Sequence, residues 1–186
     1  SFAGWAASPG GEVVYLNGQS VINLTQSGVV NLYAKWTPDD YTITYHLNGG
    51  AVSPANPTSY TIESDAITLT NPTKTGYTFA GWSGTGIIGT SMNVTISKRS
   101  TGNRSYTANW TPNTYTVCYD ANSGTGTMAD TTHTYDVEAP LRNNGFTRFG
   151  YSFAGWAAAP GGDVVYLNGQ SVINLAKSGV VTLYAK

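Results

Sequence analysis

Residues 1–35 read SFAGWAASPGGEVVYLNGQSVINLTQSGVVNLYAK, and residues 152–186 repeat this stretch almost letter for letter. A more diverged copy lies between them, because the run GYTFAGW ending at Trp82 matches the run GYSFAGW ending at Trp156, 74 residues later. Trp36 and Trp110 are separated by the same interval. A unit of about 74 residues is longer than the repeats of helical solenoids and large enough to be a small domain. The chain is therefore a tandem array.

The matching positions divide the chain into three parts. Residues 1–37 are predicted to be the C-terminal half of a repeat, residues 38–111 a complete repeat, and residues 112–186 another complete repeat that stops just short of its terminal Trp. Pro38 and Pro112 each follow the preceding Trp within a few residues. We therefore expect short and stiff linkers between the repeats.

A strand pattern opens each complete copy. The run Tyr41-Thr42-Ile43-Thr44-Tyr45 alternates apolar and polar side chains, and residues 115–119 repeat the pattern. A period of two with β-branched and aromatic residues predicts a strand with one buried face, which places Tyr115, Val117 and Tyr119 in the core. Asn- and Gly-rich residues follow at 48–50 and 122–124, where a turn requires positive φ.

Later elements of the unit are also predominantly strands. In GYTFAGW, alternation would put Phe79 and Trp82 on opposite faces, but a glycine inside a strand favours a bulge that lets the neighbouring Trp cross over. Residues 20–28 are compatible with one or two helical turns, with Ser20 as the N-cap and Gly28 beyond the C-terminus. The predicted fold class is mainly β, of the α+β type, with a short helix at most.

Composition argues against several classes of partner. Charged residues make up 10% of the chain and the formal net charge is −1, so no concentrated positive field is available for nucleic acid. No apolar stretch approaches the roughly 20 residues of a membrane span. Cys118 is the only cysteine and falls on the strand face opposite Val117 and Tyr119, so we expect it to lie outside the core.

No catalytic constellation recurs when the repeats are aligned. His46 falls on Asp120 and His133 falls on Ser59, so both histidines are expected to be solvated strand or loop residues. Carboxylates are scattered singly, apart from the pair Asp39-Asp40. The sequence therefore predicts no enzyme, no cofactor and no metal site.

Aromatic residues are the remaining candidates for an interaction site. The chain has 13 Tyr and five Trp, and those that recur inside strand motifs are expected to pack in the small cores. Trp36 and Trp110 lie next to the linkers instead. They are the candidate interaction or inter-repeat residues, able to wedge between neighbouring repeats.

Several motifs in a fixed order resemble a known family. The run YTVCYDAN at 115–122, the run GYSFAGW at 150–156 and the closing LYAK at 183–186 resemble the Listeria–Bacteroides repeat, or internalin B-repeat. The resemblance implies small β-grasp, ubiquitin-like domains in tandem on secreted or wall-anchored bacterial proteins, without catalytic residues. The middle copy departs from the pattern between Ser83 and Arg104, where it lacks the Pro-Gly-Gly turn.

Three functions are compatible with such an array. The first is a modular stalk or spacer, in the cell wall or on the bacterial surface, that presents an adhesive domain. The second is a binding module whose repeats themselves contact a host surface protein or glycan. The third is an accessory region of a glycosidase or peptidase. All three place the chain outside the cell.

Overall fold

The computed structural model describes residues 1–186, and every regular element in it is a strand. The mainly β prediction is confirmed. The chain forms two compact units, and residues of the middle repeat belong to both. The first unit comprises residues 1–44, 57–69 and 94–105, and the second comprises residues 45–56, 70–93 and 106–186. Because there is no helix, there is also none that could cross a membrane.

The first copy forms an antiparallel sheet of three strands. Its central strand, β1 (Phe2–Ala6), pairs with β2 (Val13–Tyr15) on one side and with β3 (Tyr33–Trp36) on the other. Trp5 lies opposite Tyr15 on β2 and opposite Ala34 on β3.

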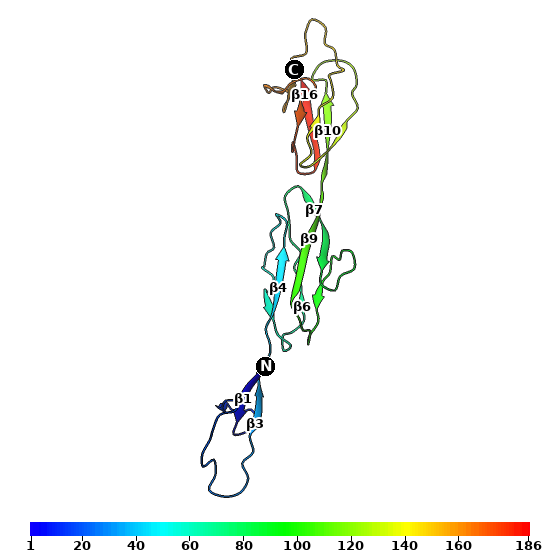
Figure 1. Ribbon diagram of the computed structural model, residues 1–186. Coiled ribbons are helices and arrows are strands. Elements are labelled where there is room, and N and C mark those ends of the chain that lie inside the picture. Colours follow the sequence, from blue (N-terminus) through cyan, green and yellow to red (C-terminus); the bar gives the residue numbers. More distant parts are fainter. The chain divides into compact units, whose positions relative to one another are not determined.

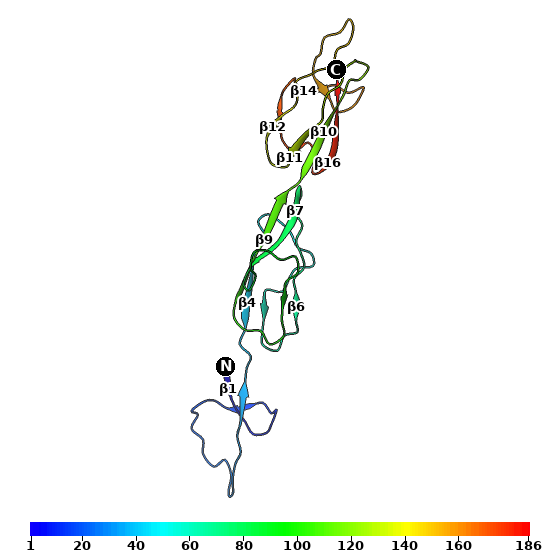
Figure 2. The ribbon, with the colours of Figure 1, turned by 90° about the vertical axis from the view of Figure 1, so that its right-hand side faces the viewer.

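The middle copy adds a hairpin to the same arrangement. Its main sheet has the order β5-β4-β9-β7, built from β4 (Tyr41–His46), β5 (Ser59–Tyr60), β7 (Tyr77–Gly84) and β9 (Arg104–Pro112). Figure 2 shows β7 running beside β9, with which it is antiparallel. A second sheet joins β6 (Ile67–Thr68) to β8 (Thr95–Ile96).

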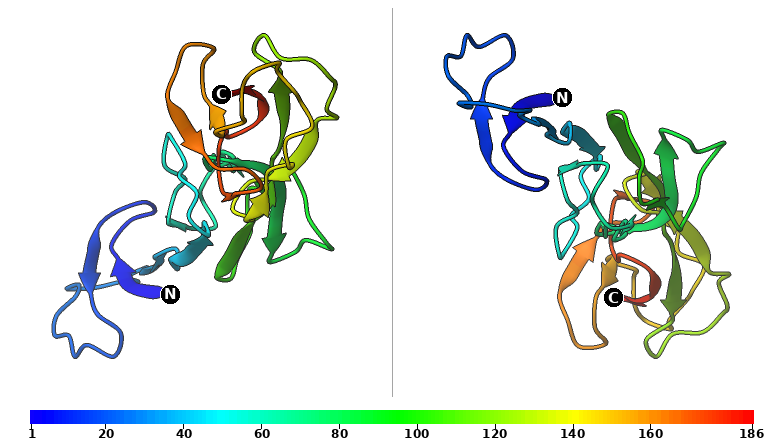
Figure 3. Two further views of the ribbon diagram at one scale, coloured as in Figure 1. Left: turned by 90° about the horizontal axis from the view of Figure 1, so that it is seen from above. Right: turned by 90° about the horizontal axis from the view of Figure 1, so that it is seen from below.

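The third copy has the most complete sheet. Its order is β11-β10-β16-β13-β14, with β10 (Thr114–Asp120), β11 (Thr131–Thr134), β13 (Trp156–Ala157), β14 (Val164–Tyr166) and β16 (Gly179–Ala185). The neighbours β10 and β16 are parallel, so the chain between them must cross over. In Figure 3 the last strand, drawn in red, lies among the other strands of this repeat. A two-stranded sheet pairs β12 (Ala139–Pro140) with β15 (Ser171–Val172).

The core of the third copy follows from the alternation on β10. Tyr115, Val117 and Tyr119 are buried as predicted, while Cys118 between them is half-buried and outside the core. The core is completed from four other segments, by Leu141, Phe146, Trp156, Val172 and Leu183.

A β-bulge in the GYTFAGW motif changes which side chains share a face. The register of β7 against β9 shifts between Phe79 and Gly81, and the rings of Phe79 and Trp82 then meet edge to face at 5.5 Å. The bulge predicted from the glycine is confirmed. In the third copy the equivalent Gly155 has φ 146°, and a Cβ there would lie 2.5 Å from Val164 Cγ1. Only glycine fits this close approach.

The short helix considered for residues 20–28 does not form. Asn23 has φ 56° and its counterpart Asn174 has φ 55°, both in the left-handed region that interrupts a helix. In the third copy the counterparts of Ser20 and Val21 form β15 and pair with β12. Extended pairing therefore replaces local helical bonding in this segment.

Candidate interaction site at the junction of two repeats

The middle and third repeats are joined by a single residue within the second compact unit. β9 ends at Pro112 and β10 begins at Thr114, so only Asn113 lies between them (Figure 1). The Asn113 amide donates a hydrogen bond to the carbonyl of Gly76 at 2.9 Å, and the Asn113 carbonyl accepts one from the Tyr135 amide at 2.8 Å. The linker backbone is thus bonded to both repeats.

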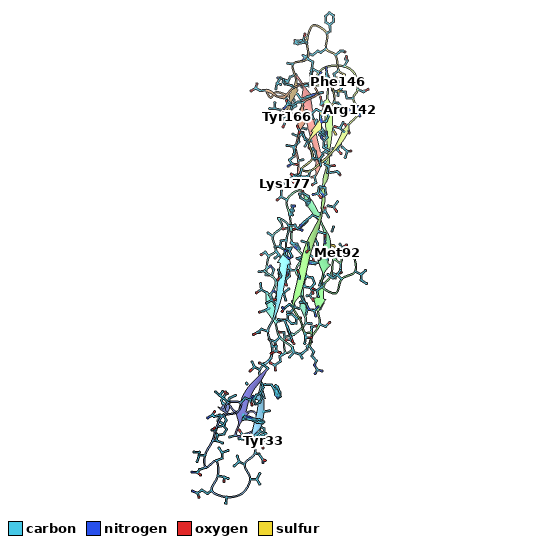
Figure 4. The ribbon with its side chains drawn as sticks, in the orientation of Figure 1. Tyr33, Met92, Arg142, Phe146, Tyr166 and Lys177 are labelled. Atoms are coloured by element: carbon cyan, nitrogen blue, oxygen red, sulfur yellow. The ribbon has the colours of Figure 1, made fainter.

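The Asn113 side chain makes the same kind of bridge. Its Oδ1 accepts a hydrogen bond from Thr78 Oγ1 at 2.7 Å, and its Nδ2 donates to the carbonyl of Lys177 at 3.2 Å. Figure 4 labels Lys177 at the end of the third repeat that faces the middle one. An Asn here uses its acceptor on one repeat and its donor on the other.

A second link joins Tyr77 of the middle repeat to a turn of the third. The Tyr77 hydroxyl donates to Asp136 Oδ2 at 2.7 Å, and the Tyr77 ring meets the ring of Tyr135 edge to face at 5.7 Å. The ammonium group of Lys74 lies 4.0 Å from the centre of the Tyr77 ring, within the range of a cation–π contact.

Asn174 holds the acceptor in place. Its Oδ1 accepts the Asp136 amide proton at 2.6 Å, and its Nδ2 donates to Asp136 Oδ1 at 2.7 Å. Both Asp136 and Asn174 have positive φ, a conformation that Asx residues tolerate better than most. The two side chains therefore present one carboxylate oxygen to Tyr77.

The link shifts the titration of both partners. Hydrogen bonds from Tyr77 and Asn174 stabilise the carboxylate and lower the pKa of Asp136. The same bond to Asp136 raises the pKa of the Tyr77 hydroxyl, because the phenolate could not donate it. The two directions agree, as expected for one shared hydrogen bond.

Close packing also requires a glycine at the junction. Gly76 has φ 76°, and a Cβ there would overlap the ring of Tyr135. Gly150, its counterpart in the third copy, has φ 76° as well but nothing within 4 Å of an added Cβ. The backbone conformation is thus common to the two copies, whereas the contact with Tyr135 belongs to the junction.

The structure places the two tryptophans singled out by the sequence against residues of their own repeats. Trp110 donates from Nε1 to the Leu47 carbonyl at 3.0 Å and meets Phe79 edge to face at 5.4 Å. Trp36 meets Phe2 at 5.4 Å and is 70% exposed. The contacts described above across the junction are made by Gly76, Tyr77, Thr78, Asn113, Tyr135, Asp136 and Lys177.

His133 differs from the expectation of a solvated residue. It is 2% exposed, stacks on Tyr115 with ring centres 5.4 Å apart, and places Nε2 3.0 Å from Thr131 Oγ1. Burial lowers its pKa because the charged imidazolium loses its hydration. Its cross-strand partner is Tyr115, just as the partner of Tyr60 is Tyr41, so its counterpart is Tyr60 and not Ser59.

No group of three or more His, Cys, Asp or Glu side chains gathers in a way that could hold a metal ion. Cys118 is near Asp130, and burial together with this carboxylate raises the pKa of its thiol. The Asp136 carboxylate is engaged in hydrogen bonds with Tyr77 and Asn174. The hydrogen bonds of Asn113 and Asp136 make the junction a polar cluster that links the middle and third repeats.

Comparison with known proteins agrees with the repeat pattern. The chain is 31% identical over 134 residues to a protein of Evansella cellulosilytica named "Putative membrane protein", which covers 67% of this chain and 19% of that protein. It is 29% identical over 126 residues to a second protein of that organism, named "Putative Gly-rich membrane protein", covering 67% of this chain and 14% of the relative. The chain therefore spans less than a fifth of either relative. No solved structure matches it.

The family model of the Listeria–Bacteroides repeat domain matches residues 41–109 and 115–186. One match lies within residues 38–111 and the other within residues 112–186, and together they leave out the junction around Asn113. With more than half of the chain matched, in two successive copies, this chain belongs to the Listeria–Bacteroides repeat family.

Proposed function

We propose that this chain is part of a stalk, a modular spacer that holds an adhesive domain away from a bacterial surface. The junction between the middle and third repeats carries the proposal. A spacer holds a domain at a distance only if its modules do not fold back on one another. A linker of one residue, with its amide and its carbonyl both hydrogen-bonded, resists bending.

Several contacts support a fixed angle at this junction. The Asn113 side chain and the Tyr77–Asp136 hydrogen bond add three bonds on top of those made by the linker backbone. A flexible Gly/Ser linker would have none of these partners. The polar character of the bonds fits an interface that stays in contact with water.

The proposal also places the repeats at a bacterial surface. The relatives are named as membrane proteins and are much longer than this chain, so the repeats would be one region of a larger surface protein. In this proposal the repeats are not catalytic, and their contribution is distance and orientation.

A replacement experiment in the parent protein tests the stalk. If the repeats supply only reach, then unrelated rigid domains of equal length should preserve adhesion, and deletion of the repeats should impair it. Loss of adhesion in the replacement protein, despite normal display on the surface, would contradict the proposal.

A second candidate function is direct binding by the repeats. The observation in its favour is a pair of exposed aromatic residues in the third repeat, Phe149 at 103% and Tyr151 at 69% exposure. If the repeats bind a host protein or glycan, the isolated chain should show saturable binding to cells or glycans that Phe149→Ala abolishes without unfolding. The stalk proposal predicts no such binding.

A further inference from the structure

The third repeat contains a hollow of about 590 Å³. Its lining includes Ala121, Gly124, Phe146, Phe153 and Ala185. Figure 4 shows Phe146, one of the lining residues, farther from the middle repeat than Lys177.

In the middle repeat, Trp110 occupies the equivalent place. Its indole Nε1 bonds to the Leu47 carbonyl, its ring meets Phe79 at 5.4 Å, and it lies so close over Gly50 that an added Cβ would overlap Cζ2. Leu47, Gly50 and Phe79 correspond to Ala121, Gly124 and Phe153 at the 74-residue interval, and all three of these line the hollow.

The turn that frames the site is the same in both copies. Asn48 has φ 50° and donates from Nδ2 to the Ala108 carbonyl at 3.0 Å; Asn122 has φ 48° and donates to the Ala185 carbonyl at 2.9 Å. The Leu47 carbonyl accepts from the Gly50 amide at 2.9 Å as well as from Trp110. The Ala121 carbonyl accepts from the Gly124 amide at 2.8 Å and has a second lone pair for an indole N–H.

The backbone hydrogen bonds of Lys186, the last residue, determine where a following residue would lie relative to the hollow. The Lys186 amide donates to the Gly155 carbonyl at 2.9 Å, and the Lys186 carbonyl accepts from the Ala154 amide at 2.7 Å. Lys186 corresponds to Asn109, and in the middle repeat the next residue, Trp110, pairs with Phe79. A residue placed after Lys186 would therefore lie opposite Phe153.

The first copy shows what the turn contributes. Trp36 follows Lys35 and meets the ring of Phe2 at 5.4 Å, the same contact that Trp110 makes with Phe79, yet it is 70% exposed. In the middle repeat the turn at residues 47–50 also contacts the indole, through the Leu47 carbonyl and Gly50, and residues 1–37 contain no counterpart of that turn. The aromatic contact alone does not bury an indole, and the hollow of the third repeat has both parts of the site.

We propose that this hollow is a receptor for a tryptophan side chain carried by the residue directly after Lys186. The indole Nε1 would donate to the Ala121 carbonyl, and the ring would pack over Gly124 and edge to face with Phe153. This inference concerns the packing of one repeat and does not depend on the stalk proposal.

The test compares two forms of the chain, one extended after Lys186 by a single Trp and one by a single Ala. The Trp form should unfold at a temperature higher by about 5 °C, because burying an indole adds apolar contact that Ala lacks. In NMR spectra the added indole N–H should exchange slowly with water, and the amides of Gly124 and Phe153 should shift between the two forms. Equal unfolding temperatures together with a freely exchanging indole would overturn the proposal.

A variant in the hollow serves as a second arm. Phe153→Ala should remove most of the difference between the Trp and Ala extensions. Because Phe153 also packs on Trp156 at 5.0 Å, the variant is less stable in itself, and the two extensions are therefore compared within the same background. If the unextended chain instead formed a dimer that Trp36→Ala dissolved, the hollow would belong to a second copy and the assignment would be wrong.

Discussion

The Tyr77 hydroxyl of the middle repeat donates a hydrogen bond to the Asp136 carboxylate of the third repeat over 2.7 Å. This bond joins two residues on opposite sides of a one-residue linker. It also lowers the pKa of Asp136, which gives the junction a property that can be measured separately from global stability.

Tyr77→Phe should raise the pKa of Asp136 toward its ordinary value, because the carboxylate loses its first hydrogen-bond donor. A pH titration of the Asp136 carboxyl carbon by NMR measures this change. Tyr151→Phe is the matched control, since Tyr151 occupies the same position in the third copy and is exposed. An Asp136 pKa that is unchanged in Tyr77→Phe would show that the bond is absent in solution.

The sign of the pH effect on the junction follows from the same shift. A carboxyl whose pKa is lowered by folding contributes stability above its ordinary pKa and loses it as the pH falls through the folded-state value. The Tyr77–Asp136 link should therefore persist at neutral pH and open only in acid. Line widths of the Tyr135 and Asn113 amides across an acid titration would report the opening.

His133→Tyr should remove a stability loss between about pH 7 and pH 5. The pKa of His133 is lowered by burial, so below its ordinary value of 6.5 the unfolded chain binds a proton that the folded chain does not, and the free energy of unfolding falls. Tyr is the natural replacement, because Tyr60 stands in the same cross-strand position and packs on Tyr41 at 5.5 Å.

Denaturant unfolding at several pH values measures this effect, and His46→Gln is the control. His46, the other histidine of the chain, lies on a strand of the middle repeat with its side chain exposed, so its replacement removes one histidine without touching the buried ring of His133. Equal pH dependence in His133→Tyr and in the unmodified chain would mean that another group titrates.

Local pattern predicted the strands but not the junction. Alternation at residues 115–119 was sufficient to place Tyr115, Val117 and Tyr119 in the core, and the glycine in GYTFAGW indicated the bulge. Asp136 falls on Glu63 once His133 is aligned with Tyr60, so comparison of the repeats matches two carboxylates but does not indicate the bond to Tyr77. Its partnership with Tyr77 depends on how one repeat meets the next, which no periodicity within a repeat encodes.

Two predictions from the sequence, the alignment of His133 and the short helix, are wrong for local reasons. A fixed interval of 74 residues aligns His133 with Ser59, because it ignores the connection between the paired strands, which is one residue shorter in the third copy. Residues 20–28 carry the capping residues of a short helix, but the pairing of β15 with β12 decides the conformation of their counterparts. Tertiary pairing overrides a weak local preference in such a short segment.

Gly155→Ala should destabilise the third repeat by about 2 kcal/mol or more, since a Cβ there would lie 2.5 Å from Val164 Cγ1 and 2.7 Å from the Tyr166 carbonyl. Gly161→Ala is the control, because nothing lies within 4 Å of a Cβ at that position. Thermal unfolding of both variants separates the close approach at the bulge from the general effect of replacing glycine. A Gly155→Ala variant as stable as Gly161→Ala would show that the bulge relaxes without cost.

Gly145→Asn should stabilise the third repeat, because it supplies an acceptor that Trp156 lacks. Trp156 is fully buried and its Nε1 has no hydrogen-bond partner, whereas the equivalent Trp82 donates to Asn71 Oδ1 at 3.0 Å. Gly145 stands where the middle copy has Asn71, and a Cβ there would meet Met128 Cγ at an acceptable 3.4 Å. Satisfying a buried donor contributes about 1 kcal/mol, and the reverse change Asn71→Gly should cost the middle repeat a similar amount. Denaturant unfolding measures both, and slower exchange of the Trp156 indole proton in Gly145→Asn would identify the bond as the cause; a gain in stability without that change would assign it to the loss of backbone freedom at Gly145.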